Sequence, residues 1–200
     1  MIDPLIQAPT GGYPTRDDIA RKYCPGAACA EIGVAFGGFA RVILAQKPSV
    51  VYLVDPWQHQ PESVYGGDQA NEPQTNFDNT FRHMKREFGP LPNVRLMRMF
   101  GFDAAQQIEN NTLDFVYIDA VHTLPMVLAD CCMWWPKLKK GGLLSGHDLS
   151  LGEMGVKGSG NYTPALQVSE ALKTFLYLVH KPQCDVVPDD QSSWGIFKGL

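Results

Sequence analysis

AEIGVAFGGFARVILAQKPSVVYLVD, residues 30–55, is the stretch that decides the fold. It reads as a strand, a glycine turn, a helix and a second strand. The turn passes through Gly33, Gly37 and Gly38, and glycine permits the backbone angles and close approach that such a turn needs. Apolar residues then recur at helical spacing until a proline stops the helix, and the β-branched run 50–54 is typical of a buried parallel strand. This unit predicts a parallel sheet.

An acidic residue stands at the carboxyl end of each of these strands: Glu31 on the first and Asp55 on the second. Two carboxylates that flank a glycine turn suit a ligand with amine or ribose hydroxyl donors. The segment 33–38 also partly fits the dinucleotide fingerprint, with Ala35 in place of its second glycine. Glu31 would repel a polyphosphate there. The turn could otherwise serve only to pack the helix on the strand.

The rest of the chain continues the alternation of strands and helices. Further strands are expected at 94–97, 113–119, 143–145, 184–187 and 193–197, and further helices at 15–23, 72–88, 104–109, 124–135 and 163–179. The last two strands are close enough in sequence to form a hairpin. The pattern predicts one α/β domain over residues 1–200, with residues 1–14 as a loose arm. Its expected core is a doubly wound, Rossmann-like, mostly parallel seven-stranded sheet with a C-terminal antiparallel hairpin.

Composition narrows the function classes. The 200 residues are 44% hydrophobic, and the formal net charge is -4, without a run of basic residues. We therefore expect no nucleic-acid partner and no binding to an anionic membrane. Neither a signal-like leader nor a long apolar segment is found, which favours a soluble, cytoplasmic protein with a small-molecule substrate. Homo-oligomerisation is left open.

The cysteines do not form a recognisable framework. Their number is odd and no C-x-x-C spacing occurs, which argues against disulfides and a zinc site. We expect mostly buried thiols, with Cys24 the most exposed. The five are Cys24, Cys29, Cys131, Cys132 and Cys184.

A second group of polar residues follows two later strands. Asp119 and His122 come after the strand 113–119, and His147 and Asp148 come after the strand 143–145. Neighbouring strands would bring these side chains to the same sheet edge as Glu31. Carboxylates and imidazoles there can hold a divalent metal, act as a general base, or do both. Singly, each could be a helix cap or a loop anchor.

Two motifs carry a family resemblance. Residues 118–122 read IDAVH, residues 141–148 read GGLLSGHD, and Trp134-Trp135-Pro136 lies between them. The chain resembles class I S-adenosylmethionine-dependent methyltransferases, and more narrowly a small bacterial group with IDAxH and GGLLxGHD motifs. The resemblance covers roughly residues 28–198.

The resemblance implies a cofactor site on the first half of the sheet. Glu31, Gly33 and Gly37 would line the methionine end of S-adenosylmethionine, and Asp55 would accept both ribose hydroxyls. Trp57 would pack near the adenine or the ribose.

The resemblance also implies a reacting site. Asp119, which would touch the cofactor as well, would hold Mg²⁺ or a similar ion together with His147 and Asp148. His122 is then the candidate base for a substrate hydroxyl, and Asp119 the second catalytic residue.

Two positions depart from the family pattern. Phe100 and Gly101 stand where the family commonly has an acidic residue and a serine that touch the adenine, and Phe100 could stack on the ring instead. After His122 the family usually continues with an aromatic and an acidic residue, whereas this chain continues with 123–125, TLP.

The sequence thus predicts O-methylation of a small hydroxylated metabolite with metal assistance. The partial glycine fingerprint keeps an NAD(P)-dependent oxidoreductase as an alternative. An iron-dependent hydroxylase related to cephalosporin hydroxylases and a non-catalytic binder with a decayed site also remain. The acceptor is not identified; the loops 58–72 and 150–162 would shape its pocket, with Tyr65, Met154 and Tyr162 as contacts.

Overall fold

The computed structural model describes residues 15–65, 70–149, 164–187 and 193–199, and the side chains of 164–166 are not described. The expected arm at 1–14, Met154 and Tyr162 therefore lie outside the described residues. The elements in chain order are α1 (Arg16–Tyr23), β1 (Ala28–Ile32), α2 (Gly38–Ala45), β2 (Val50–Val54), α3 (Glu62–Tyr65), α4 (Gln74–Phe88), β3 (Val94–Met97), α5 (Gly101–Ala105), β4 (Leu113–Ile118), α6 (Leu124–Trp134), a 3₁₀ turn (Trp135–Lys137), β5 (Leu138–Gly146), α7 (Pro164–Leu178), β6 (Asp185–Val187) and β7 (Ser193–Phe197).

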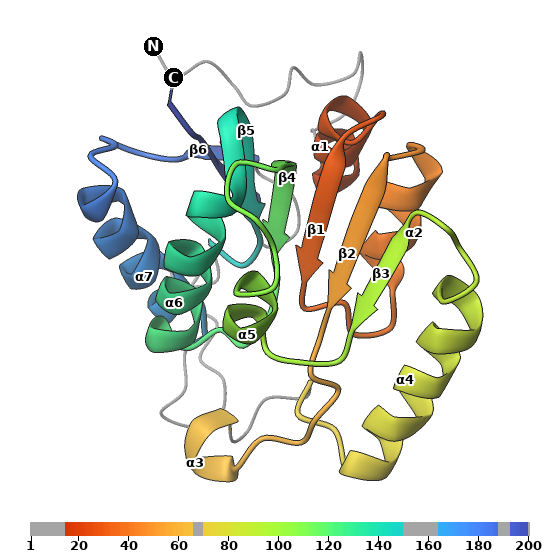
Figure 1. Ribbon diagram of the computed structural model, residues 1–200. Coiled ribbons are helices and arrows are strands. Elements are labelled where there is room, and N and C mark those ends of the chain that lie inside the picture. Colours follow the sequence, from red (N-terminus) through yellow and green to blue (C-terminus); the bar gives the residue numbers. More distant parts are fainter. Residues whose placement is uncertain (1–14, 66–69, 150–163, 188–192, 200) are drawn as a thin grey trace.

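The sheet has seven strands in the order β3-β2-β1-β4-β5-β7-β6 (Figure 1). The strands β1 to β5 pair in parallel, whereas β7 pairs antiparallel with both β5 and β6. The strand order reverses direction between β1 and β4, and ligands of open α/β sheets bind outside the strand ends at such a point. The predicted mostly parallel sheet with a terminal antiparallel hairpin is confirmed.

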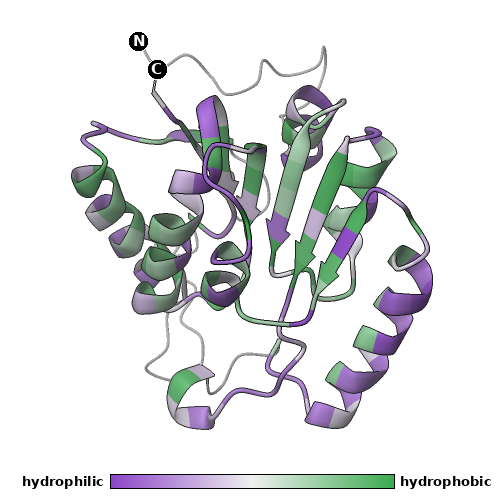
Figure 2. Cartoon of the chain, in the orientation of Figure 1, coloured by the Kyte–Doolittle hydropathy of each residue, from purple (hydrophilic) through white to green (hydrophobic). Residues whose placement is uncertain are grey.

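Helices cover both faces of the sheet, so each face has its own apolar core. On one face α1, α2 and α4 bury a cluster that includes Ile19, Phe39, Met84 and Phe88. On the other face α5, α6 and α7 bury a cluster that includes Trp134. Figure 2 shows the central strands largely green and α4 mostly purple, as expected of a buried sheet and a helix with one apolar face.

Two predicted elements differ in extent. The strand expected at 143–145 begins earlier and includes residues 139–142, which the Lys-Lys-Gly-Gly sequence would place in a turn. The amide of Gly141 donates to the carbonyl of Lys198 at 2.7 Å, and the amide of Lys198 donates to the carbonyl of Gly142 at 2.9 Å. The helix expected at 104–109 instead occupies Gly101–Ala105. Both differences depend on contacts with distant parts of the chain.

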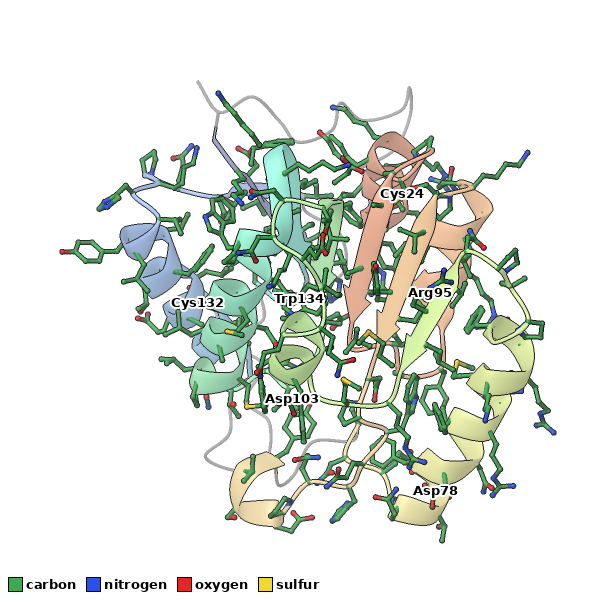
Figure 3. All side chains as sticks on the ribbon, in the orientation of Figure 1. Cys24, Asp78, Arg95, Asp103, Cys132 and Trp134 are labelled. Carbon is green, nitrogen blue, oxygen red and sulfur yellow. The ribbon has the colours of Figure 1, made fainter. Side chains whose placement is uncertain are left out.

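The prediction that Cys24 is the most exposed cysteine is wrong. Cys24 is fully buried where α1 meets the core, whereas Cys132 on the outer side of α6 is exposed (Figure 3). All five thiols are free, as expected.

The register of the sheet brings four strand ends together. Ile32 of β1 lies beside Val54 of β2 and Ile118 of β4, and Ile118 lies beside Gly146 of β5. The polar residues next to these positions therefore share one edge. In Figure 1 this edge is at the bottom, and α3 lies below it. Within the described ranges, the helices are too short or too polar to cross a bilayer.

Candidate active site

The glycine turn after β1 runs against the end of β4 without room for a side chain. Gly33 has φ of +91°, and a Cβ on it would lie 1.8 Å from the carbonyl oxygen of Asp119. The amide of Gly33 donates to Val54 at 2.9 Å, and the amide of Asp119 donates to Ile32 at 2.8 Å. These bonds fix the ends of three strands relative to one another, and only glycine fits between them.

Asp55 is a buried carboxylate that holds the turn in place. Its Oδ2 accepts the amide of Ala35 at 2.9 Å, and its Oδ1 accepts the amide of Trp57 at 2.6 Å. Burial raises the pKa of Asp55, and the backbone amides oppose that shift. A carboxylate has about four acceptor positions, so these two bonds leave it able to bind further donors.

Glu31 is the most confined acid of the site. Its side chain is 2% exposed, and among the described residues its Oε2 has no hydrogen-bond partner. Burial raises its pKa well above the ordinary value, the charges of Asp119 and Asp55 add to this, and Arg16 opposes it. A buried acceptor without a partner is costly, and a ligand that donates to it removes the cost.

Asp119 joins two groups of charged residues. Its Oδ2 lies 3.3 Å from Nη1 of Arg16, which reaches in from α1. Its other oxygen, Oδ1, lies 3.4 Å from Nε2 of His122. One carboxylate thus faces a guanidinium on one side and an imidazole on the other.

His122 lies between two carboxylates. Its Nε2 is 2.9 Å from Oδ2 of Asp148 and 3.4 Å from Oδ1 of Asp119. Burial would lower the pKa of His122, but the two acids outweigh it and raise that pKa to about 10. At neutral pH His122 therefore carries a proton unless another cation takes its place between the acids.

Asp119, His122 and Asp148 each offer a ligand atom, and these atoms lie within 4.8 Å of one another. The two carboxylates suit a divalent metal, and the imidazole beside them can serve either as a third ligand or as a base next to the ion. His147, a predicted ligand, is outside that group: its Nδ1 lies 3.4 Å from Oδ2 of Asp148. Burial raises the pKa of Asp148, but bonds to His122 and His147 outweigh it and lower that pKa below its usual range.

The strand β7 supports this cluster from behind. The indole of Trp194 donates to the carbonyl of His147 at 3.1 Å, and the hydroxyl of Ser145 donates to the carbonyl of Trp194 at 2.6 Å. The three groups are buried, so the backbone before Asp148 is held firmly.

One cavity of about 380 Å³ connects the two groups of acids. Glu31, Gly33 and Asp55 line one side, and Arg16, Asp119 and His122 line another. Segments after β2 supply much of the remaining wall, including Gln58, Tyr65, Asn71 and Phe77. Arg16 and Phe77 were not predicted as site residues, whereas Asn71 belongs to the loop 58–72 that was expected to shape the acceptor pocket. A basic residue in a helix that precedes the glycine strand is the one sequence signal for Arg16.

Several predicted cofactor residues lie outside the lining of this cavity. The Trp57 side chain is fully buried, packs on Phe81 and donates to the carbonyl of Ala35 at 3.0 Å. Phe100 stacks on Phe102 at 5.4 Å. Gly101 packs against the buried carboxyl of Asp130, and Gly37 against Phe88. None of these four residues is among the described residues that line the cavity.

Comparison with known protein families gives a match to a methyltransferase domain over residues 30–149. The match covers more than half of the chain and includes both groups of acids. The chain belongs to the methyltransferase-domain family. Comparison with curated protein sequences gives no match.

The fold of this methyltransferase-domain chain is shared with solved structures. A protein from Corynebacterium glutamicum is 16% identical, with a TM-score of 0.63 over 94% of this chain and 84% of its own. The O-methyltransferase TomG from Streptomyces achromogenes, solved with S-adenosylmethionine, is 12% identical, with a TM-score of 0.61 over 92% and 78%. The S-adenosylhomocysteine-bound methyltransferase PaMTH1 from Podospora anserina is 15% identical, with a TM-score of 0.60 over 91% and 75%.

Proposed function

We propose that this methyltransferase-domain protein transfers the methyl group of S-adenosylmethionine to an oxygen atom of a small hydroxylated molecule, with the help of a divalent metal. The observation that carries the proposal is the shared cavity. Glu31 and Asp55, which suit the cofactor, and Asp119 and His122, which suit the reaction, line the same space of about 380 Å³.

The first half of the site fits the cofactor. The partnerless Oε2 of Glu31 would accept the ammonium of the methionine end. Asp55 would accept the ribose hydroxyls with its remaining acceptor positions. The bare backbone of Gly33 would let the methionine end approach the strand closely.

The second half fits a metal and a base. Asp119 and Asp148 would hold the ion, which when bound supplies a Lewis acid that lowers the pKa of a substrate hydroxyl. His122 would take that proton, because a cation between the acids would relieve the attraction that keeps its imidazole protonated. His147 would keep Asp148 oriented.

The acceptor pocket suits a small molecule with both polar and apolar parts. Phe36 at the glycine turn is 65% exposed, and Tyr65 and Phe77 also line the cavity. Gln58, Gln60 and Asn71 add amide groups to this wall. The cavity holds the reacting groups in position, which is most of what in-line methyl transfer needs.

The alternatives are not favoured. The family match is to methyltransferases, and a carboxylate at Glu31 beside the turn would repel the pyrophosphate of a nicotinamide cofactor. An iron-dependent hydroxylase would use the same carboxylates but gives no role to the acids at 31 and 55.

Calorimetric titration with S-adenosylhomocysteine tests the cofactor half. We expect one site per chain with a micromolar dissociation constant, weakened at least tenfold by Glu31→Gln, since the ammonium then loses its charged partner. Wild-type protein that shows no binding up to millimolar ligand would disprove the proposed function.

Metal removal tests the reacting half. In EDTA we expect methyl transfer to a library of hydroxylated metabolites to cease, with the affinity for S-adenosylhomocysteine changed less than about threefold. His122→Gln should lower the rate at least about 100-fold while metal affinity stays nearly constant, as expected of a general base. His83→Gln on the exposed face of α4 is the control. Equal losses of rate and metal affinity in His122→Gln would instead make His122 a metal ligand.

A further inference from the structure

A groove lies along β3, the strand at one edge of the sheet. Its volume is about 580 Å³, which is within the range of ligand pockets in proteins. It shares no described lining residue with the active-site cavity. In Figure 1 no described helix lies in front of β2 and β3, whereas α4 lies beside β3. The groove is therefore a second site, separate from the one described above.

Much of the groove lining is apolar. Phe81 of α4 is held from behind, since its ring centre lies 5.1 Å from that of Trp57 and 4.7 Å from the guanidinium carbon of Arg98. This wall is thus in place before a ligand binds, which lowers the cost of binding. The apolar and aromatic lining residues are Tyr52, Phe81, Val94, Leu96, Met97 and Ile108.

The charged side chains of the groove are basic. Among the described residues that line it, these are Lys85 of α4 and Arg95 of β3, and none is acidic. The two acids of α4, Asp78 and Glu87, are each paired with an arginine that does not line the groove. Although the chain has a formal net charge of -4, this groove is locally positive and attracts anions.

Lys85 is available to a ligand. Its side chain is exposed, and its ammonium has no partner within the part of the chain that the structure describes. A lysine in the last turn of α4 also suits the negative end of the helix dipole, but that end amounts to only about half a unit charge. The dipole therefore leaves much of the Lys85 charge unbalanced.

Arg95 blocks the addition of a further strand to β3. The carbonyls of Asn93 and Met97 accept amides from the β2 side, so the carbonyl of Val94, which lies between them, points to the open edge. Nη1 of Arg95 donates to that carbonyl and to the carbonyl of Pro92, at 2.9 Å each. A charged side chain over an edge strand hinders pairing with another chain. The groove therefore suits a small molecule better than an added strand.

We propose that this groove binds a small molecule in which a phosphate monoester is attached to an aromatic or other apolar group. Two cations without an acid beside them suit a phosphate monoester, which carries nearly two negative charges at neutral pH. Lys85 and the N–H groups of Arg95 other than those on Nη1 would donate to the phosphate oxygens, and the apolar lining would pack on the rest of the molecule. This site is independent of the proposed methyl transfer.

Calorimetric titration of the full chain with 1-naphthyl phosphate, in EDTA and at low salt, tests the site. We expect one site per chain with a dissociation constant of about 10–100 μM, and at least tenfold weaker binding of inorganic phosphate and of 1-naphthol. Lys85→Met and Arg95→Met should each weaken the binding about 5- to 20-fold. Arg86→Met, which removes an exposed arginine of α4 outside the groove, should change it less than about twofold.

Lys85→Met keeps the test decisive if Arg95→Met does not fold, because Lys85 is exposed and makes no side-chain bond to the described residues. An affinity that Lys85→Met leaves unchanged would overturn the proposal, as would wild-type protein that binds no 1-naphthyl phosphate up to millimolar concentration. Displacement of the bound 1-naphthyl phosphate by S-adenosylhomocysteine would place it in the active-site cavity and also overturn the proposal. Inorganic phosphate that binds as tightly would deny the apolar lining a part and overturn the proposed ligand class.

Discussion

Ala35, Trp57 and Asp148 have left-handed backbone conformations, with φ of 46°, 40° and 64°. Such conformations cost side-chain-bearing residues of order 1–3 kcal/mol each and persist where the surroundings enforce them. Here Asp55 accepts the amides of both Ala35 and Trp57, and His122 binds the Asp148 carboxylate. The three strained residues therefore lie beside the two groups of acids. The contacts that enforce their conformations hold both groups in place without a ligand.

Asp130 is a second buried acid outside the cavity lining. It lies on α6 with its Oδ1 against Gly101, and among the described residues that oxygen has no hydrogen-bond partner. Burial raises the pKa of Asp130 from 3.8 to about 7. Between these values the folded protein holds a proton that the unfolded chain has lost.

Stability should therefore fall as the pH rises from about 4 to about 7 and level off above that range. Asp130→Asn lacks this titration. The free energy of unfolding of Asp130→Asn minus that of wild type should be larger at pH 8 than at pH 5 by about 2 kcal/mol, because only wild type loses stability over this range. Urea unfolding at the two pH values measures this. Asp103→Asn, at an exposed position of α5 (Figure 3), is the control. An Asp130→Asn effect that does not change with pH would contradict the assignment.

At the scale of elements, Arg98 joins the end of β3 to α4 and to the segment after β2. Its guanidinium donates to the carbonyl of Trp57 at 3.0 Å, pairs with Asp78 and lies 4.7 Å from the centre of the Phe81 ring. Asp78 is seen on α4 in Figure 3. The segment that Arg98 holds continues into the wall of the cavity at Gln58.

Arg98→Met should loosen this wall. We expect a loss of stability of about 1–2 kcal/mol and an affinity for S-adenosylhomocysteine that is about 3- to 10-fold lower. Thermal unfolding and calorimetry measure the two effects. Arg82→Met, on the exposed side of α4, should change neither quantity by a comparable amount. A stable variant with unchanged affinity would show that the wall does not depend on Arg98.

The spacing of apolar residues predicted most helices and strands, because the residues that recur at this spacing are the ones that the fold buries. The β-branched run 50–54 is a strand that pairs with a neighbour on each side, and the hairpin residues pair as expected. The spacing did not predict the bounds of an element where contacts with residues distant in the sequence determine them. Gly141 and Gly142 are in a strand because Lys198 bonds to both, and α5 begins at Gly101, which packs closely against Asp130.

At the scale of the whole molecule, the sheet brings acids that are far apart in the sequence to one edge. Glu31, Asp55 and Asp119 were predicted to share an edge, and they line one cavity. Arg16 was not predicted, because its contact with Asp119 spans 103 positions and belongs to no motif. Trp57, which was predicted to pack near the adenine or the ribose, has its indole fully buried at the turn.

The antiparallel strand β7 connects the segment of His147 and Asp148 to the strands at the C-terminal edge of the sheet. Trp194→Phe keeps an aromatic ring but removes the donor to the His147 carbonyl. Leaving that buried carbonyl without its partner should cost about 1–3 kcal/mol of stability.

Because the backbone before Asp148 is then less constrained, metal affinity should fall more than the affinity for S-adenosylhomocysteine. Calorimetry with each ligand separates the two effects. Trp134→Phe is a matched control, since its indole nitrogen is buried and has no hydrogen-bond partner within the described part of the chain. Equal losses of both affinities in Trp194→Phe would argue against a specific link between β7 and the metal.

The support of Asp148 by Trp194 also has a consequence for the order in which the site is synthesised. During synthesis Glu31, Gly33 and Asp55 leave the ribosome early, and the last acid, Asp148, follows before the indole of Trp194 that steadies it. Every acid of the site precedes Trp194 in the chain, so all of these acids are synthesised before the residue that supports Asp148. On the proposed function, the residues that would bind the cofactor are thus synthesised well before Trp194, the residue that supports the proposed metal site.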